Sequence, residues 1–301
     1  MANTDSPAGA DAGPLDETSL AQAGPYRVEA REVVVPRPGG NGQFTARLYV
    51  PLPGAGAVDE VRGVAATPIV AFGHGYLTPV ERYDSTLQQL ASWGLTVIAP
   101  RSGGGPFPDH GHFADDLGTA LDWLASVPAS KPDWPGLPIE GEARGVSGHS
   151  MGAGAAVLAA AADPRIRSLA TLAAAETRPS AIDAAARLAV PALFVAASDD
   201  AITPVAAHQQ PMYDAVSGAP AQLRTIEGGS HCGFLDEPIL PGLICDRAAI
   251  ADAEQLALSR SLLVAWFRSE LAGDERTRAT AWPEAGTEAL HLESKGSRTS
   301  D

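Results

Sequence analysis

The chain has 301 residues, of which 45% are hydrophobic and 19% are charged, and its formal net charge is −15. This composition supplies a core for one domain, and no apolar run approaches the ~20 residues that a membrane-spanning helix needs. The excess of acidic residues would repel nucleic acid and anionic membrane surfaces, which argues against both as partners. We therefore expect neutral ligands and no membrane span. We also expect a monomer.

The N-terminal segment differs in composition from the centre of the chain. Residues 1–24 are rich in Ala, Gly, Pro, Ser and Asp, which predicts a disordered tail before a folded domain at 25–272. No basic residue precedes Arg27 and the segment has no apolar stretch, so as written it does not match a secretory signal. Two compartments stay open: the cytoplasm, or export with the signal already removed.

Within this domain, short apolar runs alternate with longer helical ones, a pattern typical of crossover units around a parallel sheet. Residues 33–35 and 44–50 predict an antiparallel hairpin at the sheet edge. The following elements are predicted in chain order as strand 68–72, helix 84–93, strand 95–99, helix 113–126, strand 143–147, helix 151–162, strand 168–173, strand 191–196, helix 204–216, strand 223–226 and helix 248–271. The fold class is α/β, a mostly parallel sheet with an antiparallel N-terminal edge, helices on both faces and no large lid domain.

Two further segments are predicted to lie outside regular structure. The proline-rich stretch 127–141 is interpreted as a surface loop, because nothing in the pattern indicates a second core beyond it. Residues 273–301 are polar and lack apolar periodicity, which predicts a disordered C-terminal tail.

The segment Gly148-His149-Ser150-Met151-Gly152 fits the pattern Gly-x-Ser-x-Gly. The pattern alone is weak in a chain with 31 glycines, but here a predicted strand runs into it and a predicted helix follows it. Such a strand-to-helix turn holds the serine in a strained backbone geometry with its hydroxyl exposed, and the two glycines leave room for neighbouring elements. We predict that Ser150 is the nucleophile of an α/β-hydrolase fold.

A serine hydroxyl needs a histidine base that a carboxylate orients. In this fold the base follows both nucleophile and acid in the chain, which rules out the histidines before Ser150, namely His74, His110, His112 and His149. His208 lies in the helix predicted after the acid, and His291 lies in the predicted tail. His231, in a glycine-rich loop after strand 223–226, is therefore the predicted base.

The predicted acid follows strand 191–196, which ends in Ser198-Asp199-Asp200. Thr203 and Pro204 next in the chain look like the start of a helix. Either aspartate could turn inward, so these residues alone leave both open.

Cleavage of an acyl bond also needs two donors for the oxyanion. We predict that these are the backbone N–H groups of Met151, directly after the nucleophile, and of Tyr76, in the loop Gly73-His74-Gly75-Tyr76. His74 is expected to brace this loop.

A metal site is considered at Asp109-His110-Gly111-His112, which Asp115 and Asp116 follow. The spacing matches no metal motif, and acidic residues at the start of a helix are favoured by its dipole without any ion. The run Gly103-Gly104-Gly105 lacks the Lys and Ser/Thr of a phosphate loop. We predict neither a metal nor a cofactor.

The two cysteines, Cys232 and Cys245, lie 13 positions apart, and the first directly follows His231. A disulfide between them would tether the histidine loop. Two free buried thiols fit the sequence as well, because only the distance between the Cα atoms decides whether they can bond.

Taken together, these landmarks resemble the bacterial cutinase and polyester-hydrolase-like group of α/β-hydrolases, which is related to dienelactone hydrolases and chlorophyllase-like esterases. The resemblance spans about residues 24–271 and rests on Gly24-Pro25-Tyr26, Gly75-Tyr76, Gly-His-Ser-Met-Gly, Asp-Ala-Ile-Thr-Pro-Val from Asp200, and Gly-Gly-Ser-His at His231. It implies a serine carboxylic-ester hydrolase with an acyl-enzyme intermediate. The alternatives are a short-chain carboxylesterase, a lipase-like or chlorophyllase-like esterase without polymer activity, and a non-catalytic binding module.

The resemblance also implies roles for single residues. It places the catalytic aspartate first in the Asp-Ala-Ile-Thr-Pro-Val stretch, which favours Asp200 over Asp199. Tyr76 and Ile202 would form opposite walls of the substrate site, and Met151 would lie beneath the scissile carbonyl; we expect His149 to contact substrate too. The chain departs from the polyester degraders at residues 175–180, where it has no tryptophan.

Overall fold

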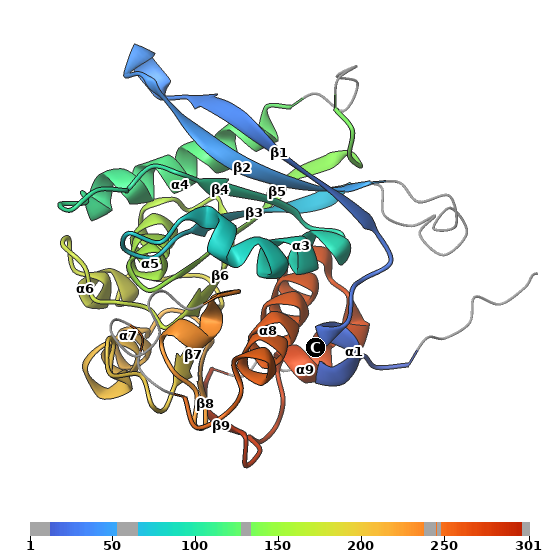
Figure 1. Cartoon of the computed structure of the whole chain (residues 1–301), viewed down its shortest axis with the longest axis vertical. Helices are drawn as coiled ribbons and strands as arrows, with labels where there is room; N and C mark the ends of the chain where they lie inside the picture. Colours follow the sequence, from blue (N-terminus) through green and yellow to red (C-terminus); the bar gives the residue numbers. More distant parts are fainter. Residues whose placement is uncertain (1–12, 53–65, 128–133, 238–244, 246–247, 297–301) are drawn as a thin grey trace, which may run out of the picture.

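The computed structural model describes residues 13–52, 66–127, 134–237, 245 and 248–296. Parts of both predicted tails and of the proline-rich loop lie outside these ranges. Within them, nine strands form one open sheet in the order β1-β2-β4-β3-β5-β6-β7-β8-β9 (Figure 1). The strands are β1 (Arg27–Pro36), β2 (Gln43–Leu52), β3 (Thr67–Gly73), β4 (Thr96–Pro100), β5 (Ile139–His149), β6 (Ile166–Leu172), β7 (Ala192–Ala197), β8 (Ala221–Ile226) and β9 (Leu290–Lys295).

The pairing of these strands confirms the predicted α/β class. Strands β3 to β8 pair in parallel, and β1 and β2 form the antiparallel N-terminal edge. The helices are α1 (Glu17–Ala21), α3 (Asp84–Ser92), α4 (His110–Ala125), α5 (Met151–Ala162), α6 (Ala181–Ala185), α7 (Gln209–Ala215), α8 (Asp252–Ala272) and α9 (Arg278–Ala281). A short 3₁₀ turn, Val205–Ala207, and a non-helical residue at His208 precede α7, so the single helix predicted at 204–216 is divided there.

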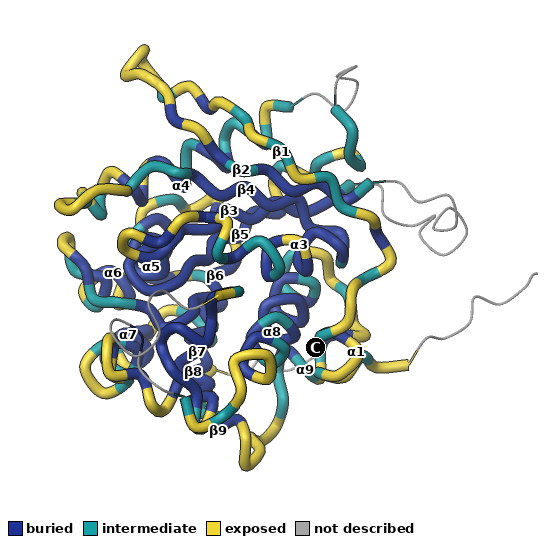
Figure 2. Tube along the Cα trace, viewed as in Figure 1, coloured by how far each residue is buried: buried dark blue, intermediate teal, exposed yellow. Residues whose placement is uncertain are grey.

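Helices cover both faces of the sheet, because side chains along each central strand point alternately to opposite sides. In β3, Ile69 and Ala71 pack with α4 and α5, whereas Val70 and Phe72 pack with α3 and α8. Every residue of β3 is buried, and the dark tube in the centre of Figure 2 follows these strands. In a parallel sheet with both faces covered, the carboxyl ends of the strands lie along one edge, and a functional site can form there.

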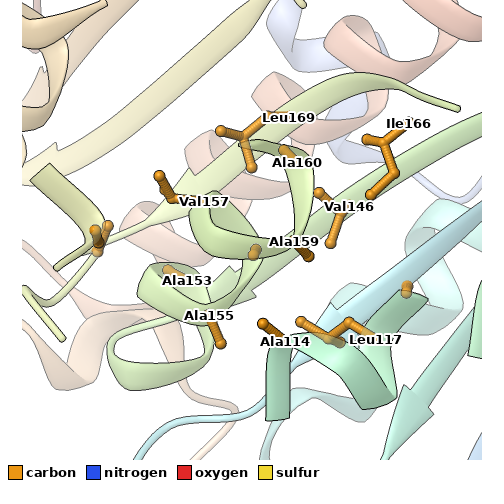
Figure 3. Packing of buried hydrophobic residues seen from close by; sticks show 14 of the residues in the cluster. Ala114, Leu117, Val146, Ala153, Ala155, Val157, Ala159, Ala160, Ile166 and Leu169 are labelled. Atoms are coloured by element: carbon orange, nitrogen blue, oxygen red, sulfur yellow. The ribbon is translucent and has the colours of Figure 1, made fainter. Parts of the chain in front are cut away.

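Helix α5 is packed unusually closely, because nearly all its residues are small. Figure 3 shows its side chains between α4 and strands β5 and β6. A Cβ atom at Gly152, in its first turn, would lie 2.2 Å from the carbonyl carbon of Gly73 at the end of β3. Glycine there lets the start of α5 contact the end of β3 directly.

The prediction that both terminal segments are disordered is wrong for those of their residues that the structure describes. Helix α1 buries Leu20 completely, and β9 extends the sheet by pairing antiparallel with β8, so the sheet has antiparallel strands at both edges. The guanidinium of Arg224, buried in β8, donates to the backbone carbonyls of Thr280 and Ala281. These segments contain few apolar residues, and buried polar contacts that composition does not reveal attach them to the core.

Candidate active site

Ser150 occupies the turn between β5 and α5, as predicted from its motif. Its backbone has φ 55° and ψ −122°, a strained geometry for a residue with a side chain. A Cβ atom at Gly148 would lie 2.6 Å from the carbonyl carbon of Gly152, so only glycine allows this turn to close. The turn directs the serine side chain towards the loops that follow β7 and β8.

The structure brings together the three residues predicted as nucleophile, base and acid. His231 Nε2 lies 2.9 Å from Ser150 Oγ, and His231 Nδ1 lies 2.7 Å from Asp200 Oδ2. The three residues follow β5, β7 and β8, and the carboxyl ends of parallel strands meet at one edge of the sheet. The imidazole can therefore accept a proton from the serine while the carboxylate holds its opposite nitrogen.

Asp200 is held in one orientation by donors on both carboxylate oxygens. Oδ1 accepts hydrogen bonds from the backbone N–H groups of Ile202 (2.9 Å) and Thr203 (2.6 Å), and Oδ2 accepts one from Thr203 Oγ1 (2.7 Å). Burial alone would raise the pKa of Asp200, but the hydrogen bonds from His231 and Thr203 outweigh it and hold the pKa below its usual value. The carboxylate is therefore charged where it faces His231, whereas Asp199 is exposed and its side chain accepts from Ser198 Oγ.

The predicted oxyanion donors are the backbone N–H groups of Met151 and Tyr76. Met151 is the first residue of α5, so its N–H has no partner within the helix. Tyr76 follows Gly75, whose N–H donates to Tyr83 Oη at 3.0 Å. His74 braces this loop as expected, with its ring nitrogens 2.8 Å from Gly75 O and 2.9 Å from Ser102 O.

Most of the large exposed hydrophobic side chains of the described residues lie on loops. In the described part of the chain there are five such side chains, and four of them are Tyr76, Leu77, Phe107 and Ile202; the fifth is Val34 on β1. Tyr76 Oη donates to Pro106 O at 3.1 Å, which joins the loop of Tyr76 to that of Phe107. Tyr76 and Ile202 were predicted here, whereas Leu77 and Phe107 were not, because the sequence does not show which loop side chains face solvent.

The predicted substrate contact of His149 is not supported. Its side chain is only 2% exposed, and its two ring nitrogens face Tyr83 Oη and the carbonyl of His231. The side chain points into the protein, although its neighbour Ser150 faces the site.

Comparison with known families then identifies the kind of protein. The family model described as PET hydrolase-like matches residues 3–237. The chain belongs to the PET hydrolase-like family. Membership confirms the resemblance noted from the sequence and makes the chain a hydrolase of the ester-hydrolase type. No curated protein matches the chain.

In this PET hydrolase-like chain the histidine loop is tethered covalently. Cys232 and Cys245 form a disulfide, with their Cα atoms 5.5 Å apart. Because Cys232 directly follows His231, the bond fixes the loop at the residue next to the imidazole.

The acidic and histidine-rich segment at 109–116 has contacts within the protein. Asp116 accepts two hydrogen bonds from Arg37, both at 2.7 Å, and Asp109 caps the first turn of α4. His110 Nδ1 accepts from the N–H of Arg178. Among the described residues no group of three or more His, Cys, Asp or Glu could hold a metal ion. Nor does any helix in those ranges combine the length and apolar character needed to cross a bilayer.

Proposed function

We propose that the chain is a serine carboxylic-ester hydrolase in which Ser150, His231 and Asp200 act as nucleophile, base and orienting acid. The observation that carries the proposal is the imidazole of His231, which lies within hydrogen-bond distance of Ser150 Oγ and of Asp200 Oδ2 at once. Membership of an ester-hydrolase family supports the same chemistry.

The reaction would proceed through an acyl-enzyme. Ser150 Oγ attacks the ester carbonyl while His231 Nε2 takes its proton, and the N–H groups of Tyr76 and Met151 stabilise the oxyanion. His231 then returns the proton to the leaving alcohol, which departs as the carbonyl re-forms. Water, activated by the same imidazole, releases the acid. Apart from the water, each proposed step uses only side chains and backbone of this chain.

For the substrate, we propose a cutinase-like or polyester-hydrolase-like specificity. The exposed rim of Tyr76, Leu77, Phe107 and Ile202 supports it, because an open apolar surface can receive a chain too long to enter a closed pocket. A short-chain carboxylesterase is the second candidate, and the missing aromatic side chain at residues 175–180 favours it.

The experiment measures hydrolysis of p-nitrophenyl butyrate by the wild type and by Ser150→Ala. We expect turnover to fall by about five to six orders of magnitude, as when the nucleophile of a serine hydrolase triad is removed. A Ser150→Ala protein with near-wild-type turnover would rule out the assignment. Labelling of the wild type by a fluorophosphonate probe separates an enzyme from a binding module. Esters of increasing chain length, then an aliphatic and an aromatic polyester, separate the two specificities.

A further inference from the structure

We propose that Tyr83 and His149 are positioning residues that join the oxyanion loop to the loop of the catalytic histidine. This inference rests on the proposed function, since it concerns the same site. Neither side chain faces the substrate: Tyr83 is fully buried and His149 is 2% exposed. Their effect would reach the reaction through the loops that they hold.

A continuous series of hydrogen bonds connects the two loops. The N–H of Gly75 lies 3.0 Å from Tyr83 Oη, Tyr83 Oη lies 2.8 Å from His149 Nδ1, and His149 Nε2 lies 3.1 Å from the carbonyl oxygen of His231. The first residue precedes Tyr76, the predicted oxyanion donor, and the last is the predicted base. The series thus begins and ends on the backbone of the catalytic site.

The direction of each hydrogen bond follows from the chemistry of its groups. A carbonyl only accepts, so His149 Nε2 must carry the hydrogen that faces His231 O. Burial, together with the nearby His231, holds the pKa of His149 well below its usual value, so the ring is neutral and its Nδ1 accepts. The Tyr83 hydroxyl must then donate to Nδ1, which leaves its oxygen free to accept from Gly75. Every member therefore has one compatible arrangement.

The packing around this series leaves little space for a different arrangement. A Cβ atom at Gly75 would lie 3.0 Å from Tyr83 Oη and 3.2 Å from His149 Nδ1. The ring of His149 lies between those of Tyr83 and His231, with centroids 5.6 Å and 4.7 Å away. A shift of either loop would therefore be transmitted to the other.

The consequence for catalysis is an oxyanion donor held in the correct position. Because Tyr83 accepts from the N–H of Gly75, the peptide plane between His74 and Gly75 is held in place. The next peptide plane, which carries the Tyr76 N–H, is held at Gly75 O by the N–H of Thr78 and by His74 Nδ1, so the position of Gly75 sets the direction of the Tyr76 N–H. Loss of an oxyanion donor costs about 10² to 10³ in kcat, and a misdirected donor should cost a fraction of that. Substrate binding in the ground state should change little.

The test compares Tyr83→Phe with a matched control, Tyr49→Phe. Tyr49 is also fully buried, and its hydroxyl donates to Asp84, the residue after Tyr83 at the start of α3, but it lies outside the series. With p-nitrophenyl butyrate we expect Tyr83→Phe to lower kcat about 10-fold or more with KM within about 2-fold, and Tyr49→Phe to leave both within about 2-fold. The Ki of a phenylboronic acid, which forms a tetrahedral adduct with a reactive serine, should rise in Tyr83→Phe only.

A second pair of variants keeps the inference testable if Tyr83→Phe does not fold. His149→Gln retains one donor and one acceptor, whereas His149→Leu has neither, so the leucine variant should lose more kcat than the glutamine variant at unchanged KM. Equal kcat in the two tyrosine variants, or in the two His149 variants, would overturn the inference while leaving the proposed function intact. If instead the wild type does not react with fluorophosphonate and Ser150→Ala remains active, the proposed function itself fails.

Discussion

The two sides of the candidate active site differ in how firmly the protein holds them. On the acid–base side, Asp200 and His231 are buried, and each bonds to partners at 2.6–2.9 Å. On the substrate side, Tyr76 is 47% exposed, Phe107 95% and Ile202 43%. Charged side chains that are buried and hydrogen-bonded keep a fixed geometry, whereas exposed apolar side chains can adapt to different substrates.

Residues 200–203 show both properties within four positions. The N–H of Ile202 donates to Asp200 Oδ1 while its side chain faces solvent, and Thr203 next to it is 3% exposed and contacts both Asp200 and His231. The chemistry can therefore stay constant while side chains one residue away change the specificity. The predictions below test this division, in order of decreasing effect.

Among the predictions of this section, replacement of the acid should have the largest effect. Asp200→Asn keeps the shape of the side chain but removes the charge that faces His231 Nδ1, and we expect kcat to fall by about 10⁴, as when the aspartate of a serine protease triad becomes asparagine. Asp199→Asn is the matched control and should stay within about 2-fold of the wild type. Steady-state kinetics on p-nitrophenyl butyrate measures both. A larger loss in Asp199→Asn would transfer the role of acid to that residue.

The disulfide should matter next, and mainly for stability. The double variant Cys232→Ser/Cys245→Ser should lose about 3 kcal/mol of unfolding free energy, the value expected for a closed loop of roughly this length. Urea unfolding with and without a reductant measures it, and the reductant should destabilise the wild type but not the variant. A loss below about 1 kcal/mol would mean that buried contacts, rather than the covalent bond, hold the histidine loop.

The acid–base side is also the part that could be predicted from the sequence. Its residues follow strands in a fixed order along the chain, so the strand-to-helix turn at Ser150 and the loop at His231 could be recognised without coordinates. The residues alone could not decide whether Asp199 or Asp200 is the acid, because the direction of a side chain after a strand depends on its tertiary partners. The disulfide was left open for the same reason.

The structure differed from the predictions where the decisive partner lies far away in the chain. His149 is adjacent to the nucleophile, but its ring is directed inward by Tyr83, which is 66 positions away. The terminal segments lack apolar periodicity, yet Leu20 is buried and the Arg224 guanidinium in β8 holds the carbonyls that end α9. Local pattern contains no information about such contacts.

On the substrate side, shortening the exposed side chains should affect bulky substrates selectively. Phe107→Ala and Leu77→Ala should lower release of soluble products from an aliphatic polyester film several-fold and leave p-nitrophenyl butyrate turnover within about 2-fold, because each removes exposed apolar contact area without touching the triad. Val34→Ala, at the exposed residue on β1, is the matched control and should change neither rate. Equal rates on the film for all three variants would show that the rim does not receive the polymer.

The smallest expected effect concerns His208. His208 Nδ1 accepts a hydrogen bond from the N–H of Glu176 in the loop after β6. Burial lowers the pKa of His208 below the usual 6.5, and the nearby His231 lowers it as well. The negative charges of Asp200 and Glu176 oppose this shift without reversing it. Below pH 6.5 the unfolded chain therefore binds the proton more readily than the folded one, so the unfolding free energy falls as pH falls from 6.5 towards the folded pKa. Above pH 6.5 this contribution is constant.

His208→Asn isolates this contribution, because asparagine offers Glu176 an acceptor that does not titrate. Urea unfolding at pH 7.5 and at pH 5.5 measures the fall in unfolding free energy of each protein. Since the imidazole is partly solvated, we expect this fall to be only a few tenths of a kcal/mol smaller in the variant than in the wild type. Equal losses in the two proteins would mean that the N–H of Glu176 finds another acceptor when His208 is protonated. The loop after β6 would then belong with the adaptable substrate side rather than with the firmly held acid–base side.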